Sequence, residues 1–130
     1  MSSPSVLLAD DNPTVLEAVS RILSPGFEIV GTVKDGMSLI TEARRLGPDV
    51  MIVDMFMPGL SGIEAARELK KQHITGSIIF LTVYGDPFFV QEIRALGAMG
   101  YVLKSSADRD LIPAIREALQ GHFYQSPSLV

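Results

Sequence analysis

The sequence predicts an α/β fold in which a five-stranded parallel sheet is covered on both faces by five helices. Short apolar segments alternate with amphipathic segments five times along the 130 residues, which is typical of consecutive strand–helix–strand units. The central apolar segments contain no polar interruption, as expected for parallel strands buried on both faces. With 47% hydrophobic residues, the chain is long enough to form one domain with a buried core.

The first strand and helix are predicted from the stretch VLLADDNP. Val6–Ala9 is apolar throughout, which indicates a buried strand. Asn12 and Pro13 then provide a helix N-cap and a proline at the first helical position, and Pro25 ends this helix. The next segment, Phe27–Val33, alternates partly between apolar and polar residues, which favours an edge strand.

The middle of the chain contains the strand on which the predicted site depends. Asp35 caps a second helix that ends near Leu46. The apolar residues Val50–Val53 predict a central strand that places Asp54 at its carboxyl end. Proline and glycine residues follow, so the chain must turn sharply before a third helix, Ile63–Lys71.

The C-terminal part continues the alternation. Ser77–Val83 predicts a fourth buried strand, after which Asp86 and Pro87 begin a fourth helix with a cap and a proline. Gly100–Leu103 predicts a short fifth strand. Residues 122–130 lack any periodicity and predict an irregular tail.

A last helix is predicted over Ala107–Leu119. Pro113 falls inside it, where its ring removes a backbone donor and clashes with the carbonyl of Arg109. We therefore expect the helix to bend there or to begin late, at about Leu111. Its predicted inward face consists of apolar residues at helical spacing, namely Leu111, Ile112, Ile115 and Leu119.

Composition narrows the class of protein. Eleven Lys and Arg against fifteen Asp and Glu give a net charge of -4, which argues against a nucleic-acid-binding surface on this domain. Zero cysteines exclude disulfides and thiolate metal sites. The N-terminus lacks the pattern of a signal peptide, and no apolar run approaches the roughly 20 residues that span a bilayer. We expect a cytoplasmic protein with no membrane partner.

Polar residues follow the predicted strands at their carboxyl ends: Asp10, Asp11, Asp54, Thr82 and Lys104. In a flavodoxin-like sheet of strand order 2-1-3-4-5, strands one and three are neighbours, so the three carboxylates would converge in one crevice. Crowded carboxylates require raised pKa values or a bound cation, and Mg²⁺ is the natural ion for such oxygen ligands. Asp54 could also accept a phosphoryl group, with Lys104 neutralising its charge and Thr82 donating a hydrogen bond.

Each of these residues also has an ordinary structural explanation. Asp54 alone could serve a turn, and Asp10 and Asp11 could be an acidic pair favoured at a helix N-terminus. Thr82 alone is more often a strand residue, and Lys104 alone is more often a solvated surface charge. Their occurrence together, at matched strand ends, favours a functional site.

Four stretches that are distributed over nearly the whole chain place this site in a known context: LLADDNP, VDMFMPGLSG, LTVYGD and GYVLKSS. In these stretches the sequence resembles the receiver domain of two-component response regulators. The further stretches AIREALQG and YQSP are most similar to the NarL/FixJ-type subfamily. Receivers of that subfamily usually precede a helix-turn-helix DNA-binding domain.

The resemblance implies a role for each matched residue. Asp54 would accept the phosphoryl group from a sensor histidine kinase, and Lys104 would contact that group. Thr82 and Tyr101 match the positions of the family's switch pair. The implied ligands of Mg²⁺ are Asp10, Asp11, Asp54 and the backbone carbonyl of Phe56. The chain would catalyse only its own phosphorylation and slow dephosphorylation, and would not be an enzyme acting on other substrates.

Three further positions affect the expected site and its surface. Ser105 stands where many receivers carry a proline, and because a non-proline cis bond costs roughly 3 to 4 kcal/mol, we do not assume one at Lys104–Ser105. Val83 stands where the family commonly has a small residue, and we expect it to gate the in-line approach to Asp54. Helical angle places Phe88 on the outer side of the fourth helix as a partner surface, unless it folds onto the preceding loop.

Other functions stay open at this point. A stand-alone phosphorelay receiver would use the same residues. A Mg²⁺-dependent aspartyl-phosphate phosphohydrolase would want a second Asp where Phe56 stands, and a flavin or nucleotide site would want a phosphate loop where the sequence has ADDN. We expect residues 1–121 to form the receiver and residues 122–130 to begin a linker to an output domain that binds DNA. Phosphorylation could also lead to a homodimer.

Overall fold

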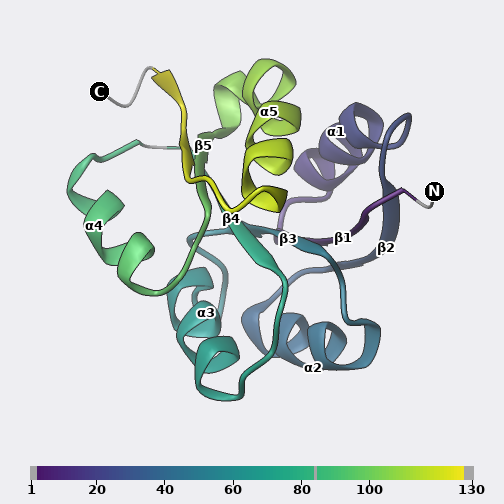
Figure 1. Cartoon of the computed structure of the whole chain (residues 1–130). Helices are drawn as coiled ribbons and strands as arrows, with labels where there is room; N and C mark the ends of the chain where they lie inside the picture. Colours follow the sequence, from purple (N-terminus) through teal and green to yellow (C-terminus); the bar gives the residue numbers. More distant parts are fainter. Residues whose placement is uncertain (1–2, 84, 128–130) are drawn as a thin grey trace.

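The computed structural model describes residues 3–83 and 85–127, which form a parallel sheet between two layers of helices (Figure 1). The strands are β1 (Ser5–Ala9), β2 (Glu28–Val33), β3 (Val50–Asp54), β4 (Ser77–Thr82), β5 (Gly100–Leu103) and β6 (Tyr124–Gln125). The helices are α1 (Pro13–Leu23), α2 (Gly36–Leu46), α3 (Gly62–Lys71), α4 (Phe88–Ala95) and α5 (Ala107–Leu119), with a 3₁₀ turn, η1 (Lys104–Ser106), before α5. Within this part of the chain, every helix is too short or too polar to cross a bilayer.

The sheet has the order β2-β1-β3-β4-β5-β6, and all neighbouring strands are parallel. The predicted order of the first five strands is confirmed. The expectation of five strands with an irregular tail is wrong, because Tyr124–Gln125 pairs with Gly100–Tyr101 as a sixth strand. Two residues carry no periodicity that a sequence pattern could detect, and α5 supplies the crossover that a further parallel strand requires.

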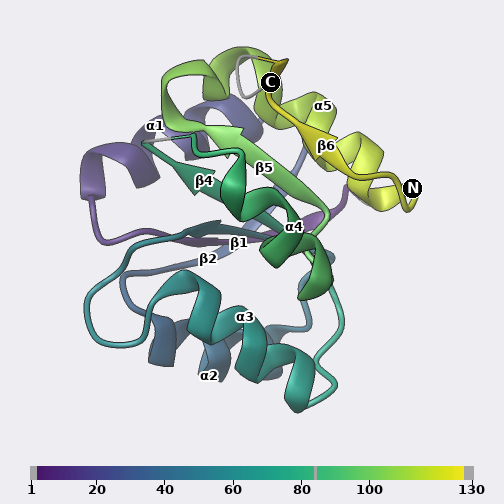
Figure 2. The ribbon, with the colours of Figure 1, turned by 90° about the vertical axis from the view of Figure 1, so that its left-hand side faces the viewer.

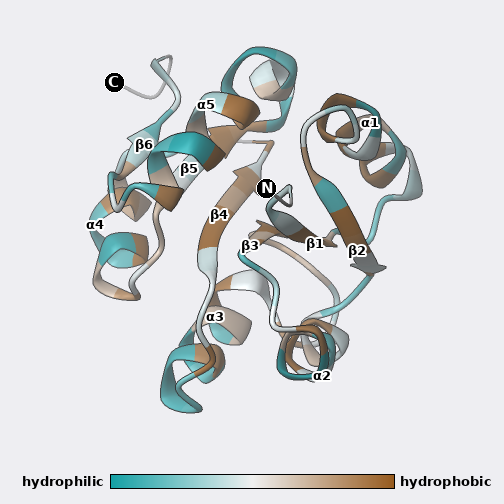
Figure 3. Ribbon diagram, turned by 45° about the vertical axis from the view of Figure 1, so that its right-hand side comes forward, coloured by the Kyte–Doolittle hydropathy of each residue, from teal (hydrophilic) through white to brown (hydrophobic). Residues whose placement is uncertain are grey.

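Two apolar cores lie on opposite faces of the sheet. Helices α1 and α5 cover one face, and α2, α3 and α4 cover the other (Figure 2). The alternation within β1 shows the division, since Leu7 belongs to one core and Leu8 to the other. Apolar residues colour β4 and the inward helix faces, whereas polar residues gather on the outer turns (Figure 3). Strands that are apolar on both sides thus occupy the centre, as predicted.

Local side-chain caps fix where the first two helices begin. The side chain of Asn12 accepts a hydrogen bond from the Thr14 N–H at 2.9 Å, and that of Asp35 accepts from the Ser38 N–H at 2.8 Å. Both predicted caps are therefore confirmed. At α4, Asp86 accepts a hydrogen bond from the Phe88 N–H at 3.0 Å, and the helix itself begins at Phe88.

Helix α5 departs from its prediction in two respects. It begins at Ala107, so the late start near Leu111 is wrong. Pro113 has no N–H group, so the Arg109 carbonyl loses its helical hydrogen bond. Both residues lie on the exposed side of the helix, where water can solvate that carbonyl, and the helix continues. Leu119 is 43% exposed and does not belong to the inward face. The buried residues of α5 are Ala107, Asp110, Leu111, Ala114, Ile115 and Ala118.

Candidate functional site

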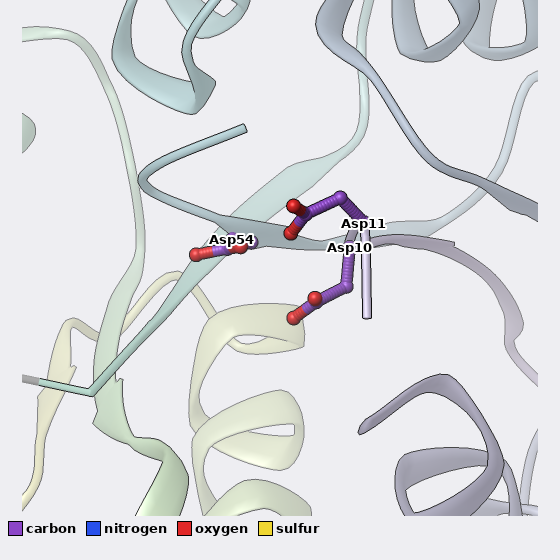
Figure 4. Close-up of side chains that lie close together, drawn as sticks. All are labelled: Asp10, Asp11 and Asp54. Atoms are coloured by element: carbon purple, nitrogen blue, oxygen red, sulfur yellow. The ribbon is translucent and has the colours of Figure 1, made fainter. Parts of the chain in front are cut away.

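Three carboxylates meet at the carboxyl edge of the sheet. Asp54 is the last residue of β3, and Asp10 and Asp11 directly follow β1. Because β1 and β3 pair in parallel, their ends lie side by side. Carboxylate oxygens of the three residues lie within 4.8 Å of one another, and the side chains gather at one point (Figure 4). The predicted convergence of these acids is confirmed.

The backbone around Asp54 requires a glycine at the start of α3. The Gly62 N–H donates to the Met55 carbonyl at 3.0 Å, and a Cβ atom at Gly62 would overlap the carbonyl oxygen of Asp54. Only glycine therefore permits this close approach. The Phe56 N–H donates to Asp54 Oδ1 at 3.2 Å, so the loop also orients the carboxylate.

Lys104 brings the positive charge of the site. Its Nζ atom lies 2.8 Å from Asp10 Oδ2 and 3.4 Å from Asp54 Oδ2, and its side chain is mostly buried. Burial lowers the pKa of Lys104, but the two carboxylates outweigh it and hold that pKa above its ordinary value. The lysine therefore stays charged at neutral pH.

Asp54 is electrostatically unlike an ordinary surface acid. Its residue exposure is only 6%, and this burial raises the pKa of its carboxyl group. The hydrogen bond from Phe56 lowers that pKa, the charge of Asp10 raises it, and Lys104 lowers it, with a net rise. The ionised carboxylate is thus incompletely compensated, and a further positive charge would stabilise it.

An open cavity of about 320 Å³ gives access to Asp54. Thr82 ends β4 as a buried residue on its wall, and Val83 follows with 61% of its surface exposed. The structure therefore places both predicted residues beside the acidic cluster. The lining residues are Asp11, Asn12, Asp54, Phe56, Thr82, Val83 and Lys104.

Two predicted residues lie away from this cavity. Tyr101 is fully buried in β5, and its hydroxyl lies 3.4 Å from the Asp86 carbonyl and 3.3 Å from the Asp86 N–H. It therefore contacts the β4–α4 loop and not the carboxylates. Phe88 is 79% exposed on α4, so it does not fold away from solvent. The Lys104–Ser105 peptide bond is trans.

The donor set fits a metal ion. Three carboxylates contribute oxygen atoms within 4.8 Å of one another, and a single lysine does not neutralise them. Hard divalent cations prefer such oxygen ligands. Asp10, Asp11 and Asp54 could therefore hold one.

A second polar cluster was not predicted from the sequence. Asp110 is 2% exposed and accepts hydrogen bonds from Ser106 Oγ at 2.8 Å, Ser126 Oγ at 2.9 Å and the Tyr124 hydroxyl at 2.9 Å. One signal was available, because Asp110 lies one residue before Leu111 on the inward face of its helix. An acid on an apolar helix face indicates a buried, partnered carboxylate.

Comparison with known sequences agrees with the geometry. The family described as the response regulator receiver domain matches residues 6–116. The nitrate/nitrite response regulator protein NarP of Escherichia coli (strain K12) is 37% identical over 118 residues, which cover 89% of this chain and 55% of NarP. The transcriptional regulatory protein DesR of Bacillus subtilis (strain 168) is 36% identical over 129 residues, which cover 97% of this chain and 63% of DesR. This chain thus spans between half and two thirds of these curated relatives.

Comparison with solved structures also identifies response regulators. A LuxR-family two-component response regulator from Aurantimonas sp. SI85-9A1 superposes with a TM-score of 0.92 at 32% identity, covering 98% of this chain and 93% of that one. The two-component response regulator RcsB, in a structure of its complex with DNA, superposes with a TM-score of 0.88 at 30% identity, covering 98% and 66%. The relatives are signalling receivers and transcriptional regulators, not classical enzymes. This chain belongs to the receiver domains of two-component response regulators, of the NarL/FixJ type.

Proposed function

We propose that Asp54 accepts a phosphoryl group from a sensor histidine kinase and that the modified chain acts as a signalling switch. The observation that carries this proposal is the position of Asp54. It lies in an open cavity beside two further carboxylates and within 3.4 Å of the Lys104 ammonium group. A carboxylate oxygen of Asp54 would attack phosphorus while the bond from phosphorus to the leaving imidazole breaks.

The other site residues would each stabilise charge. Asp10, Asp11, Asp54 and the Phe56 backbone carbonyl would hold Mg²⁺, which neutralises negative charge on the transferring group. Lys104 would move from the Asp10 and Asp54 carboxylates toward a phosphoryl oxygen. The hydroxyl of Thr82 would donate a hydrogen bond to another such oxygen. Hydrolysis of the acyl phosphate on the same residues would reset the switch slowly.

The response to phosphorylation would pass through Thr82 and Tyr101. Thr82 lies on the wall of the cavity, and the Tyr101 hydroxyl lies near the backbone of Asp86 in the loop that leads to α4. Movement of Thr82 toward the phosphoryl group would change this loop and thus alter the contacts of Tyr101. The surface of α4 that includes Phe88 would then present a changed face to a kinase or to a second copy of the chain.

The proposed output is control of transcription. The RcsB structure is of a complex with DNA, and this chain spans only part of such regulators. We propose that the receiver unit extends past the expected boundary at residue 121 to include β6 and Ser126, which pair with β5. The residues that follow would lead toward a DNA-binding output domain, and the regulator would work in the cytoplasm. The net charge of -4 argues against a DNA-binding surface on the receiver itself.

Phosphorylation by acetyl phosphate tests the proposal. Intact-mass measurement should show one added phosphate with Mg²⁺, and none after chelation of the metal or in Asp54→Asn. Asp35→Asn is the matched control, because asparagine caps a helix as well as aspartate does, and it should be labelled like wild type. Equal labelling of Asp54→Asn and wild type would refute the assignment.

A further inference from the structure

The active-site lysine is held by hydrogen bonds on both of its sides along the chain. Leu103, directly before Lys104, donates its N–H to Ser126 Oγ at 3.2 Å. Ser106, at the end of the turn that begins with Lys104, donates its hydroxyl to Asp110 Oδ2 at 2.8 Å. Ser126 Oγ donates to the same Asp110 oxygen at 2.9 Å. The two flanks of Lys104 are thus joined through one serine and one carboxylate.

These hydrogen bonds are buried. Ser126 is fully buried, and Asp110 and Ser106 are nearly so. Burial raises the pKa of the Asp110 carboxyl, but the hydrogen bonds from Ser106, Ser126 and Tyr124 outweigh it and lower the pKa below its ordinary value. Asp110 is therefore ionised, and hydrogen bonds to a buried charge are stronger than neutral ones.

The position of Ser126 is itself fixed by backbone pairing. The Ser126 N–H donates to the Tyr101 carbonyl and the Tyr124 N–H donates to the Met99 carbonyl, both at 3.0 Å. These bonds set the register of β6 against β5, so Ser126 lies opposite the end of β5. The segment after α5 therefore reaches the residue that precedes Lys104.

We infer that Ser126 and Asp110 are positioning residues for Lys104, and that the segment after α5 takes part in phosphoryl transfer through Ser126. The inference rests on the proposed function, in which the Lys104 ammonium group must reach the incoming phosphoryl oxygen. Catalysis by positioning is sensitive to displacements of about 1 Å. A loosened turn at Lys104 would slow transfer without removing a metal ligand.

Two matched substitutions test this inference. Ser126→Ala and Tyr124→Phe each remove one hydroxyl that donates to Asp110 from the same segment, but only Ser126 also accepts the Leu103 N–H. The rate of labelling is measured over a range of acetyl phosphate concentrations, with Mg²⁺ affinity and melting temperature measured on the same samples. Ser126→Ala should lower the maximal rate about fivefold and leave Mg²⁺ affinity within about twofold. Tyr124→Phe should keep the wild-type rate, and Ser126→Thr, which retains a hydroxyl, should restore it.

A double-mutant cycle distinguishes positioning from general loosening. If Ser126 acts through Lys104, adding Ser126→Ala to Lys104→Met should not lower the residual rate further. A further loss there, or equal losses in Ser126→Ala and Tyr124→Phe, would overturn the inference. Should Ser126→Ala fail to fold, Ser106→Ala opens the same link from the other flank and carries the same expectations. Absence of labelling in wild type would instead refute the proposed function.

Discussion

Two aspartates of this domain are almost equally shielded from solvent but differ in the groups that surround them. Asp54 is 6% exposed and Asp110 is 2% exposed. Burial raises the pKa of Asp54, and its neighbours do not reverse this. Burial also raises the pKa of Asp110, but the hydrogen bonds from three hydroxyl groups, together with the charge of Arg109, outweigh it and lower that pKa. Burial by itself therefore does not determine the state of a carboxylate; the donors around it do.

The comparison separates a reactive acid from a structural one. The hydrogen bond from Phe56 and the charge of Lys104 do not offset the burial of Asp54, which opens into a cavity that a cation and a phosphoryl group could fill. Asp110 accepts bonds from Ser106, Ser126 and Tyr124. A carboxylate whose charge is fully compensated stabilises the native state, whereas one whose charge is incompletely compensated keeps affinity for a cation.

The largest expected effect is on stability. Asp110→Asn should lower the free energy of unfolding by about 3 kcal/mol, because the amide offers one acceptor to three donors in a buried site. Asp54→Asn should raise the free energy of unfolding by about 1 kcal/mol, because it removes a poorly compensated charge. Urea denaturation at neutral pH measures both free energies of unfolding. A similar decrease in the two variants would contradict the distinction between Asp54 and Asp110.

Asp110 and Asp54 should also contribute to the pH dependence of stability with opposite signs. Asp110 has a folded-state pKa below its ordinary value of 3.8, so its stabilisation is present above that pH and is lost as the pH falls through the folded-state pKa. Asp54 has a folded-state pKa above 3.8, so stability declines as the pH rises from 3.8 through that pKa.

Urea denaturation of wild type and both variants between about pH 3 and pH 7 tests these signs. The advantage of Asp54→Asn over wild type should grow as the pH rises, and the deficit of Asp110→Asn should shrink in acid. An advantage of Asp54→Asn that shrinks with rising pH would contradict the raised pKa.

A smaller effect is expected where the Asp54 cavity meets solvent. Val83 is 61% exposed on its wall, and its stiff branched side chain should obstruct the in-line approach to phosphorus. Val83→Ala should speed both labelling by acetyl phosphate and loss of the phosphate about threefold, with unchanged Mg²⁺ affinity. Stopped-flow measurement of both rates decides this, and unchanged or slower rates would exclude Val83 as a gate.

The smallest expected stability change is at Phe88. This residue is 79% exposed, so Phe88→Ser should change the free energy of unfolding by less than about 0.5 kcal/mol. It should nevertheless weaken phosphotransfer from a histidine kinase or self-association, because an exposed aromatic favours a partner surface. Phe89→Ser is the matched control, since Phe89 packs against the core and its loss should destabilise the fold. A several-degree drop in melting temperature for Phe88→Ser would show that it is structural.

Much of the fold followed from local sequence patterns. The order along the chain of the first five strands and the five helices was predicted correctly, and so were the caps at Asn12 and Asp35 and the acids after β1 and β3. Each of these features depends on residues that are close in sequence. Parallel strands place their carboxyl ends at one edge, so Asp10, Asp11 and Asp54 could be brought together without coordinates. The resemblance to receivers rested on these same residues.

Only the tertiary structure decided what depends on contacts between distant segments. β6 exists because α5 returns the chain beside β5, and two residues carry no signal of that pairing. The inward face of α5 includes Asp110, because Ser126 and Tyr124 supply hydrogen-bond donors from beyond the helix. A sequence pattern ranks residues by their own hydrophobicity. Whether a buried carboxylate is satisfied depends on donors that the fold brings from elsewhere.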